Sequence, residues 1–434
     1  METLVGFAGI AVLLFLLALG VPIAFAMGFT GFVGFAFLWG MGPAITLTIL
    51  TAYTKLNSFI LVCIPLFMFM GQTLFYSGTA GDMFTALNRW LSRLPGGLAM
   101  AVTATSAGFA SVSGSSPAVV ATMGSVALPE MRKYDYSPRL ATGCIAAAGT
   151  LGILIPPSIP MVLYGILTEQ SIGRLFIAGI VPGVVSAGLY MAMIYLRAKH
   201  NPMLAPPGPS TPWKEKLRSI RKVYIVGAIF IIVIGGIYLG IFTPTEASAV
   251  GAFIVLLIGL VQRKLTKRSI LSSMEQTAHT TGMILAIITA AMVFSTFLVT
   301  TGLTSALANF VISLNANRHV ILLAMLFIYL VLGTCLCVIS IIVITIPLFF
   351  PIVMGLGFDP IWFGVLVTKM IEVALITPPI GFNCLILKSV SGDYATVGDI
   401  FAGIGWFFVM DLITIVILVA FPQISLFLPN LMFQ

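Results

Sequence analysis

The chain has 434 residues, of which 59% are hydrophobic and 8% are charged, whereas a soluble domain carries about 25% charged residues. This composition excludes a soluble fold and predicts an integral membrane protein, in which each spanning helix needs roughly 20 apolar residues. The net charge of +8 does not indicate nucleic-acid binding. Its Lys and Arg residues lie in short links between apolar runs, without interleaved aromatics, as the positive-inside rule describes.

The apolar runs begin almost at Met1, without a positively charged segment before the first run or a small-residue cleavage site after it. We therefore expect a retained span rather than a signal peptide. A basic, proline-rich linker at 197–222 divides the series near its middle. The runs are 4–19, 23–39, 58–76, 98–128, 139–167, 175–196, 223–241, 245–261, 278–299, 320–350, 361–387 and 400–421.

Two runs are too long for one span and too broken for two. Run 98–128 is interrupted by Ser111–Pro117, and run 320–350 is interrupted around Gly333–Cys335 and at Ser340. Each run predicts a re-entrant hairpin, which enters and leaves the membrane by the same face.

Two other runs carry a double proline in mid-span. Run 139–167 contains Pro156-Pro157, and run 361–387 contains Pro378-Pro379. A double proline removes two backbone donors and clashes with the preceding turn. We therefore expect both helices to break at these positions.

Prolines recur at an offset of 222 residues. Six prolines match, against roughly 0.65 expected for 24 prolines in 434 residues, which indicates an internal repeat. The predicted units are a first repeat at 1–200, a linker at 201–222 and a second repeat at 223–434. The matches are Pro22 with Pro244, Pro129 with Pro351, Pro138 with Pro360, Pro156 with Pro378, Pro157 with Pro379, and Pro207 with Pro429.

The repeats are predicted to have opposite orientations in the membrane. Links 129–139 and 262–268 are basic, whereas their partners 351–361 and 40–46 carry no Lys or Arg. If the hairpins re-enter, each half crosses five times, both termini lie outside and the linker is cytoplasmic. We predict an all-α membrane protein with two inverted-topology repeats, about ten crossings, two re-entrant hairpins and two Pro-Pro-broken helices. This is the architecture of an alternating-access carrier.

The breaks are where we expect the chemistry, because lipid cannot satisfy an unwound backbone. Carbonyls at a Pro-Pro break can ligate a hard cation such as Na⁺, and the N-termini of half-helices attract a carboxylate. Ser and Gly that only let helices pack closely are the alternative. Four serines at one tip, a double proline and a symmetric copy favour the site.

Ionisable residues within the runs are few. Lys369 and Glu372 are three residues apart and can pair on one helix face, either as a structural pair or as part of ion coupling. Glu246 is expected to cap the start of its helix, and Asp411 stands alone in the last run. The cysteines are expected to be buried hydrophobic residues rather than a metal or disulfide site; they are Cys63, Cys144, Cys335, Cys337 and Cys384.

Four segments resemble the large membrane subunit of tripartite ATP-independent periplasmic (TRAP) transporters, and the resemblance covers nearly the whole chain. They are Ser-Val-Ser-Gly-Ser-Ser-Pro-Ala (111–118), Leu-Gly-Ile-Leu-Ile-Pro-Pro-Ser (151–158), Phe-Thr-Pro-Thr-Glu-Ala-Ser-Ala (242–249) and Ile-Thr-Pro-Pro-Ile-Gly-Phe-Asn (376–383). The resemblance implies a multi-pass permease of the bacterial inner membrane that works as an elevator and couples uptake to Na⁺. It also implies two partners, an extracytoplasmic substrate-binding protein and a separate small four-helix membrane subunit.

The same resemblance implies a sodium site where each hairpin tip meets the broken helix of its own half. The first site would involve Ser111, Ser113, Gly152, Ile155 and Pro157, and the second Gly333, Ala374, Thr377 and Ile380. We expect the solute, a small organic acid, to be bound by Ser115, Ser116, Ser158 and Asn383.

Two other functions are alternatives to this one. A stand-alone elevator-type carrier for a carboxylate or an ion would have no gene for a binding protein beside it. An intramembrane enzyme would need a nucleophile–base pair or a metal cluster in its spans, and the sequence shows neither these nor an HExxH, GxSxG or phosphate-loop motif. Sialic acids, C4-dicarboxylates, other sugar acids and ectoine-like solutes all fit the predicted transporter.

Overall fold

The structure is a computed structural model that describes residues 2–209, 211–314, 316–334 and 336–432, and every regular element in these ranges is a helix. Cys335, in the predicted interruption of the second hairpin, lies outside the described residues. Eight segments of the described chain are long and apolar enough to cross a membrane by length and composition. The all-helical membrane class is confirmed, and the figure of about ten crossings stays a prediction.

The helices of the first half are α1 (Glu2–Ala18), α2 (Ile23–Trp39), α3 (Met41–Leu56), η1 (Phe59–Val62), α4 (Cys63–Tyr76), α5 (Thr79–Leu91), α6 (Gly97–Ser113), α7 (Ser116–Lys133), α8 (Pro138–Leu154), α9 (Ile159–Thr168), α10 (Ile172–His200) and η2 (Pro202–Leu204). Those of the second half are α11 (Trp213–Tyr238), α12 (Pro244–Val261), α13 (Lys267–Thr300), α14 (Leu303–Ser313), α15 (Arg318–Gly333), α16 (Val338–Gly355), α17 (Pro360–Ala374), α18 (Phe382–Ser391), α19 (Val397–Ala420) and α20 (Gln423–Leu431).

The two predicted hairpins are the helix pairs α6–α7 and α15–α16. Between α6 and α7 only Gly114 and Ser115 are non-helical, so this interruption is shorter than the predicted Ser111–Pro117. Gly114 adopts a left-handed conformation (φ +60°), which ends α6 without the steric cost of a side chain. Pro117 lies in the first turn of α7, where its missing N–H has no helical partner to lose.

Both predicted breaks are confirmed. The first helix stops at the end of α8 and resumes as α9 after Pro156-Pro157, and the second stops at the end of α17 and resumes as α18 after Pro378-Pro379. The peptide bond within each double proline is cis. The order of elements also recurs, since Pro138 begins α8 and Pro360 begins α17, 222 residues later.

Four helices, α3, α5, α14 and α20, were not predicted from the sequence, and the predicted start of α11 is too late. This helix begins at Trp213, inside the linker assigned to 201–222. Helix α5 is amphipathic, with Asp82 and Arg89 among its residues, so no apolar run marks it.

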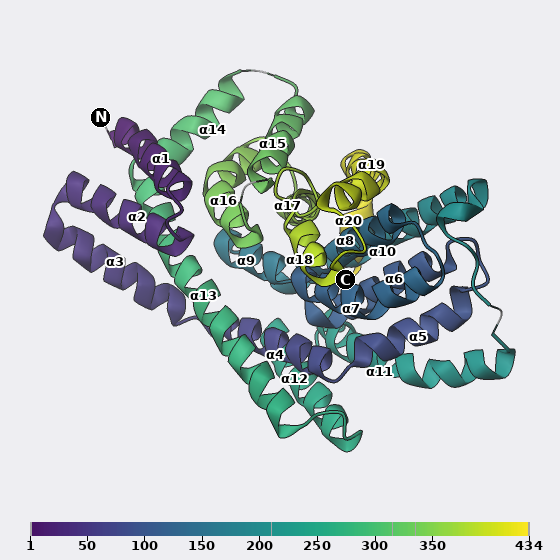
Figure 1. Ribbon diagram of the computed structural model, residues 1–434. Helices are drawn as coiled ribbons and strands as arrows, with labels where there is room; N and C mark the ends of the chain where they lie inside the picture. The colour runs from purple at the N-terminus through teal and green to yellow at the C-terminus, as the bar shows by residue number, and fades with distance from the viewer. Residues whose placement is uncertain (1, 210, 315, 335, 433–434) are drawn as a thin grey trace.

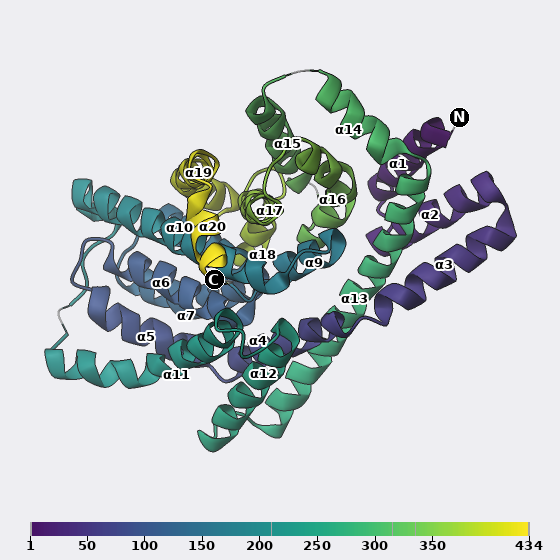
Figure 2. The same cartoon turned by 180° about the vertical axis from the view of Figure 1, so that it is seen from behind.

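The longest helix, α13, separates two groups of helices (Figure 1). It has 34 residues, which corresponds to about 51 Å at 1.5 Å per residue. Helices α1 to α3 lie on one side of it, and both hairpins, both broken helices, α10 and α19 form a compact group on the other, as the view from behind also shows (Figure 2). The candidate site lies inside this compact group.

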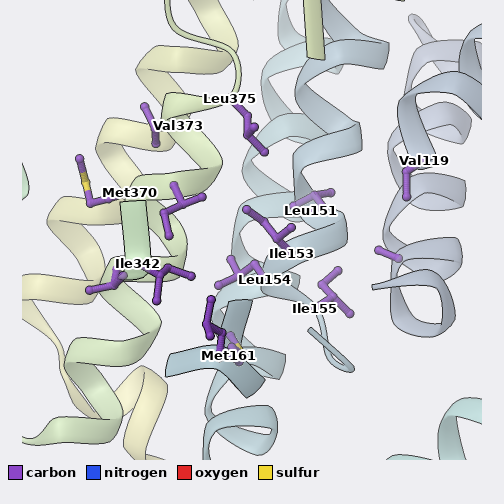
Figure 3. Packing of buried hydrophobic residues seen from close by; sticks show 14 of the residues in the cluster. Val119, Leu151, Ile153, Leu154, Ile155, Met161, Ile342, Met370, Val373 and Leu375 are labelled. Atoms are coloured by element: carbon purple, nitrogen blue, oxygen red, sulfur yellow. The ribbon is translucent and has the colours of Figure 1, made fainter. Parts of the chain in front are cut away.

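Apolar side chains fill the space between the two broken helices (Figure 3). On α8 and at the first break they point toward the end of α17 on one side and toward α7 on the other. The labelled members of this cluster are Val119, Leu151, Ile153, Leu154, Ile155, Met161, Ile342, Met370, Val373 and Leu375. The two breaks are therefore held by one continuous core.

Candidate functional site

The tip of the first hairpin packs directly on the first break. A methyl group added to Gly114 would lie 2.8 Å from the carbonyl oxygen of Pro157, and one added to Gly152 would lie 3.2 Å from the backbone of Ser115 and Ser116. Glycine at position 114 allows this approach of two backbones, and a side chain at position 152 would make a tight contact. The structure thus brings together the tip and the break that the sequence analysis assigned to one site.

A small cavity of about 10 Å³ lies between this tip and this break. Its volume is near the lower limit for holding one water molecule. The hydroxyl of Ser113 is buried and has no hydrogen-bond partner among the described residues. The cavity is lined by Ile64, Phe67, Ser113, Gly114, Pro157, Ser158, Ile159 and Val162.

The other residues predicted for the first site have additional contacts. The hydroxyl of Ser111 donates to the carbonyl of Gly108 at 2.6 Å, so its proton is used within its own helix. The side chain of Ile155 is buried against Gly183. The hydroxyls of Ser111 and Ser113 thus differ, because only that of Ser113 lacks a partner.

The second break is arranged in the same way but is more open. A methyl group on Gly333 would lie 2.1 Å from the side chain of Ala374, so the second tip also touches its break. The hydroxyl of Thr377 donates to the carbonyl of Val373 at 2.7 Å, and its side chain is half-buried. Ile380 is 40% exposed, whereas all of residues 151–158 at the first break are buried.

Three of the four residues predicted to bind solute are buried and hydrogen-bonded within the chain. The amide of Asn383 donates to the Ser116 hydroxyl at 2.8 Å and to the carbonyl of Ala146 at 3.1 Å. The hydroxyl of Ser158 donates to the carbonyl of Ile153 and caps the first turn of α9. Only Ser115 is partly exposed. In this conformation Asn383 and Ser116 tie the first hairpin to the second broken helix.

Three buried charged side chains meet next to the breaks. The ammonium of Lys369 donates to Glu372 Oε2 at 2.8 Å, to Asp411 Oδ1 at 2.7 Å and to the Ser186 hydroxyl at 3.1 Å. The predicted pairing of Lys369 with Glu372 is confirmed, and the partner of Asp411 is now identified. All three charged side chains are completely buried.

Two further hydroxyls complete this cluster. That of Thr150 lies 2.9 Å from Glu372 Oε1 and 2.7 Å from the carbonyl of Ala147, and that of Tyr190 donates to Asp411 Oδ1 at 2.5 Å. The roles of Tyr190 and Asp411 could not be predicted from the sequence, because their contacts join separate helices. The repeat offset of 222 residues relates Thr150 to Glu372, and this spacing was a signal in the sequence for their contact.

Two predictions about single residue types have different outcomes. Glu246 forms a capping box with Thr243 at the start of α12, as predicted. Cys337 is exposed, which contradicts the prediction that the cysteines are buried; it lies at the start of α16, where the second tip reaches the surface. Cys63, Cys144 and Cys384 are buried.

The oxygens around both breaks are neutral carbonyls and hydroxyls. No group of three or more His, Cys, Asp or Glu side chains that could hold a metal occurs among the residues that the structure describes. Neutral oxygens suit a hard monovalent cation. The C-terminal ends of α8 and α17 also point their partial negative charge toward the breaks.

Comparisons with known proteins identify the family of the chain. Residues 10–424 match the family described as the DctM component of the tripartite ATP-independent periplasmic transporter. The C4-dicarboxylate TRAP transporter large permease protein DctM of Pseudomonas aeruginosa is 37% identical over 371 residues, which cover 85% of this chain and 86% of that protein. The ectoine/5-hydroxyectoine TRAP transporter large permease protein UehC of Ruegeria pomeroyi is 32% identical and covers 96% and 97%.

A solved structure shares the fold at low sequence identity. The crystal structure of the YdaH transporter of Alcanivorax borkumensis matches with a TM-score of 0.59 and 15% identity, covering 90% of this chain and 88% of that one. At this identity the likeness concerns the fold alone. On the family match and the permease relatives, the chain belongs to the DctM component family of TRAP transporters, whose large permeases are membrane transport proteins that work with a binding protein.

Proposed function

We propose that this chain is the membrane subunit of a sodium-driven importer for a small carboxylate-bearing solute, located in a bacterial inner membrane. An extracytoplasmic binding protein delivers the solute, and a small four-helix membrane subunit completes the permease. The observation that carries the proposal is the meeting of each hairpin tip with a Pro-Pro break.

Ion binding at the breaks is supported by the donor atoms present. The unpartnered hydroxyl of Ser113 and the cavity beside Pro157 suit a Na⁺ ion at the first break. At the second break the hydroxyl of Thr377 donates to Val373, and its lone pairs stay free to ligate a cation. Gly152 and Ile155 at the first break, and Gly333, Ala374 and Ile380 at the second, would contribute backbone contacts.

Binding of a carboxylate is supported by the half-helices that resume after each break. Helices α9 and α18 begin there, and their N-termini attract negative charge. The two relatives described above are named for C4-dicarboxylates and for ectoine, and these solutes all carry a carboxylate. The partly exposed Ser115 is the candidate that a solute reaches first, and Ser116, Ser158 and Asn383 would become accessible in another conformation.

Alternating access by an elevator motion is supported by the recurring order of elements and by the basic links. Residues 1–200 and 223–434 would form inverted repeats joined by a cytoplasmic linker at 201–222. The compact group of hairpins and broken helices would move against α1 to α4 and α11 to α13. The paired hairpins and breaks would carry the ions and the solute together.

The test is uptake of labelled solute into proteoliposomes. With the small subunit and the loaded binding protein present, we expect uptake only under an inward Na⁺ gradient. The chain reconstituted alone should not move free solute. Robust uptake without a binding protein would support the stand-alone carrier instead, and uptake independent of Na⁺ would refute the sodium coupling.

A further inference from the structure

Helix α4 covers the small cavity at the first break. Ile64 and Phe67 of this helix line the cavity together with residues of the first tip and of α9. Both side chains are buried, with 1% and 4% of their surface exposed. Gly71 lies on the same face of α4, because residues three and four positions apart share one face of a helix. We call Ile64, Phe67 and Gly71 the docking face of α4.

Gly71 lets the backbone of α4 approach the first tip. A methyl group added to Gly71 would lie 2.7 Å from the carbonyl oxygen and 2.9 Å from the Cα atom of Ser113, the last residue of α6. Carbon and oxygen atoms at these distances overlap, and backbone atoms cannot rotate away as the end of a side chain can. The tip therefore keeps this position only because residue 71 has no side chain.

The contact between Gly71 and Ser113 joins the two groups of helices. Helix α4 packs on α12 and α13, as both views show (Figures 1 and 2). A methyl group added to Gly251 of α12 would meet Met70 Sδ at 2.6 Å, so α4 and α12 are also in close contact. In the proposed elevator motion α4 stays with these helices while the first hairpin moves. The contact between Gly71 and Ser113 then has to break in each cycle.

The equivalent face of the second half is different. At the repeat offset of 222 residues, Ile64 corresponds to Ala286 and Gly71 corresponds to Val293, both on α13. Val293 carries a side chain where the first half has glycine, and Ala286 is exposed where Ile64 is buried. Residues 378–380 of the second break are exposed as well. In this conformation the first break is covered and the second is open.

We propose that α4 closes the first break. The first hairpin docks on Gly71, and the cavity beside Ser113 and Pro157 opens to solvent only when the tip leaves the docking face of α4. This inference rests on the proposed elevator motion. The second break is already open while the first is closed, so the two candidate ion sites exchange with solvent in different conformations. Gly71 is the positioning residue that holds the first site closed.

A cysteine in the cavity wall reports whether the cavity is closed. Val162 lines the cavity, is 1% exposed and is not a candidate ligand, so Val162→Cys places a thiol there with little change in volume. Cys335 and Cys337 are replaced by Ser in this variant, because Cys337 is exposed and would react. The full chain with its small membrane subunit is reconstituted in liposomes and treated with a small methanethiosulfonate reagent. At rest we expect slow modification of the thiol at position 162.

Gly71→Ala should open the cavity. The added methyl displaces the tip, and we expect modification of the Val162→Cys thiol to become roughly tenfold faster, within the range for a methyl forced into a packed contact. The matched control is Gly227→Ala on α11, whose methyl meets nothing within 4 Å and should leave the rate unchanged. Cys144 is fully buried in α8 and should stay unreactive in both variants, which shows that the fold is intact.

A second measurement keeps Gly71 and uses transport to move the tip. The Val162→Cys thiol is modified at rest and during uptake driven by loaded binding protein and an inward Na⁺ gradient. Because the tip leaves the docking face of α4 in each cycle, modification should be faster during uptake than at rest. This comparison decides the question if Cys144 becomes reactive in Gly71→Ala, since that variant is then unfolded.

The outcomes are distinguishable. An unchanged modification rate in folded Gly71→Ala overturns the closure by α4, and so does a rate that is the same during uptake as at rest. An equal acceleration in Gly227→Ala also overturns it, because the effect then does not depend on the contact with Ser113. Absence of uptake in the complete system refutes the proposed transport function, while the comparison of Gly71→Ala with Gly227→Ala at rest still tests the docking of the tip.

Discussion

Thr377→Val removes the hydroxyl oxygen at the second break and keeps the side-chain shape. The hydroxyl donates to the carbonyl of Val373, so its lone pairs are available to a cation. Loss of one neutral partner of a buried group costs about 1–3 kcal/mol. Since Thr377 is only half-buried, water can partly replace it. We therefore expect about 1–1.5 kcal/mol, or roughly fivefold to tenfold weaker sodium dependence.

The assay is solute uptake against Na⁺ concentration in proteoliposomes that contain the chain, its small subunit and the binding protein. Thr377→Ser retains the oxygen and should stay close to the wild type. Ile155→Val changes the equivalent position of the first half, where no side-chain oxygen exists, and should change the half-saturating Na⁺ little. If Thr377→Val leaves that concentration unchanged at normal protein levels, Thr377 is not a ligand, and the break acts as a hinge.

Three further predictions concern packing and topology. Gly403→Ala should destabilise the folded protein by about 1–3 kcal/mol and lower its melting temperature, because the added methyl would meet a backbone oxygen of α8. Gly405→Ala on the same helix meets nothing within 4 Å and should be neutral or slightly stabilising. Equal effects of the two substitutions would refute this packing. Asn383→Ala should destabilise the folded protein by about 2–3 kcal/mol, since it leaves a buried hydroxyl and a carbonyl without their partner, and an unchanged thermal melt would contradict those hydrogen bonds. Cysteines placed at Pro209 and Asn430 should react with an impermeant reagent from opposite sides of the membrane, and labelling from one side would refute the inverted repeats.

Local backbone chemistry was readable from the sequence. Pro156-Pro157 and Pro378-Pro379 cannot continue a helix, so both breaks were predicted at the right residues. The hairpin around Gly114 was predicted for the same kind of reason, although its serines proved to be mostly helical. Helix α5 was missed because its apolar residues lie on one face only, which leaves no continuous run.

Contacts between segments that are distant in the chain could not be predicted from the sequence. Asp411 had no assigned partner, because Lys369 and Tyr190 lie on other helices and no local spacing relates them to it. Burial of Asn383 and Ser116 was also missed. Both are polar and lie near the breaks, which suits a solute site equally well, and only the packing shows that they bind each other in this conformation.

The buried cluster also constrains how the chain is made. The hydrogen bonds from Thr150 to Glu372 and from Tyr190 to Asp411 join residues 222 and 221 positions apart. A charged side chain at the centre of a span costs about 2.5–3.5 kcal/mol during insertion, and Asp411 enters the bilayer without a neighbour in its own helix to pair with. Its partners are in place only because translation has already delivered α10 and α17. A ribosome that stops before α19 leaves Lys369 with Glu372 alone, so the unfinished product lacks one of its two buried ion pairs.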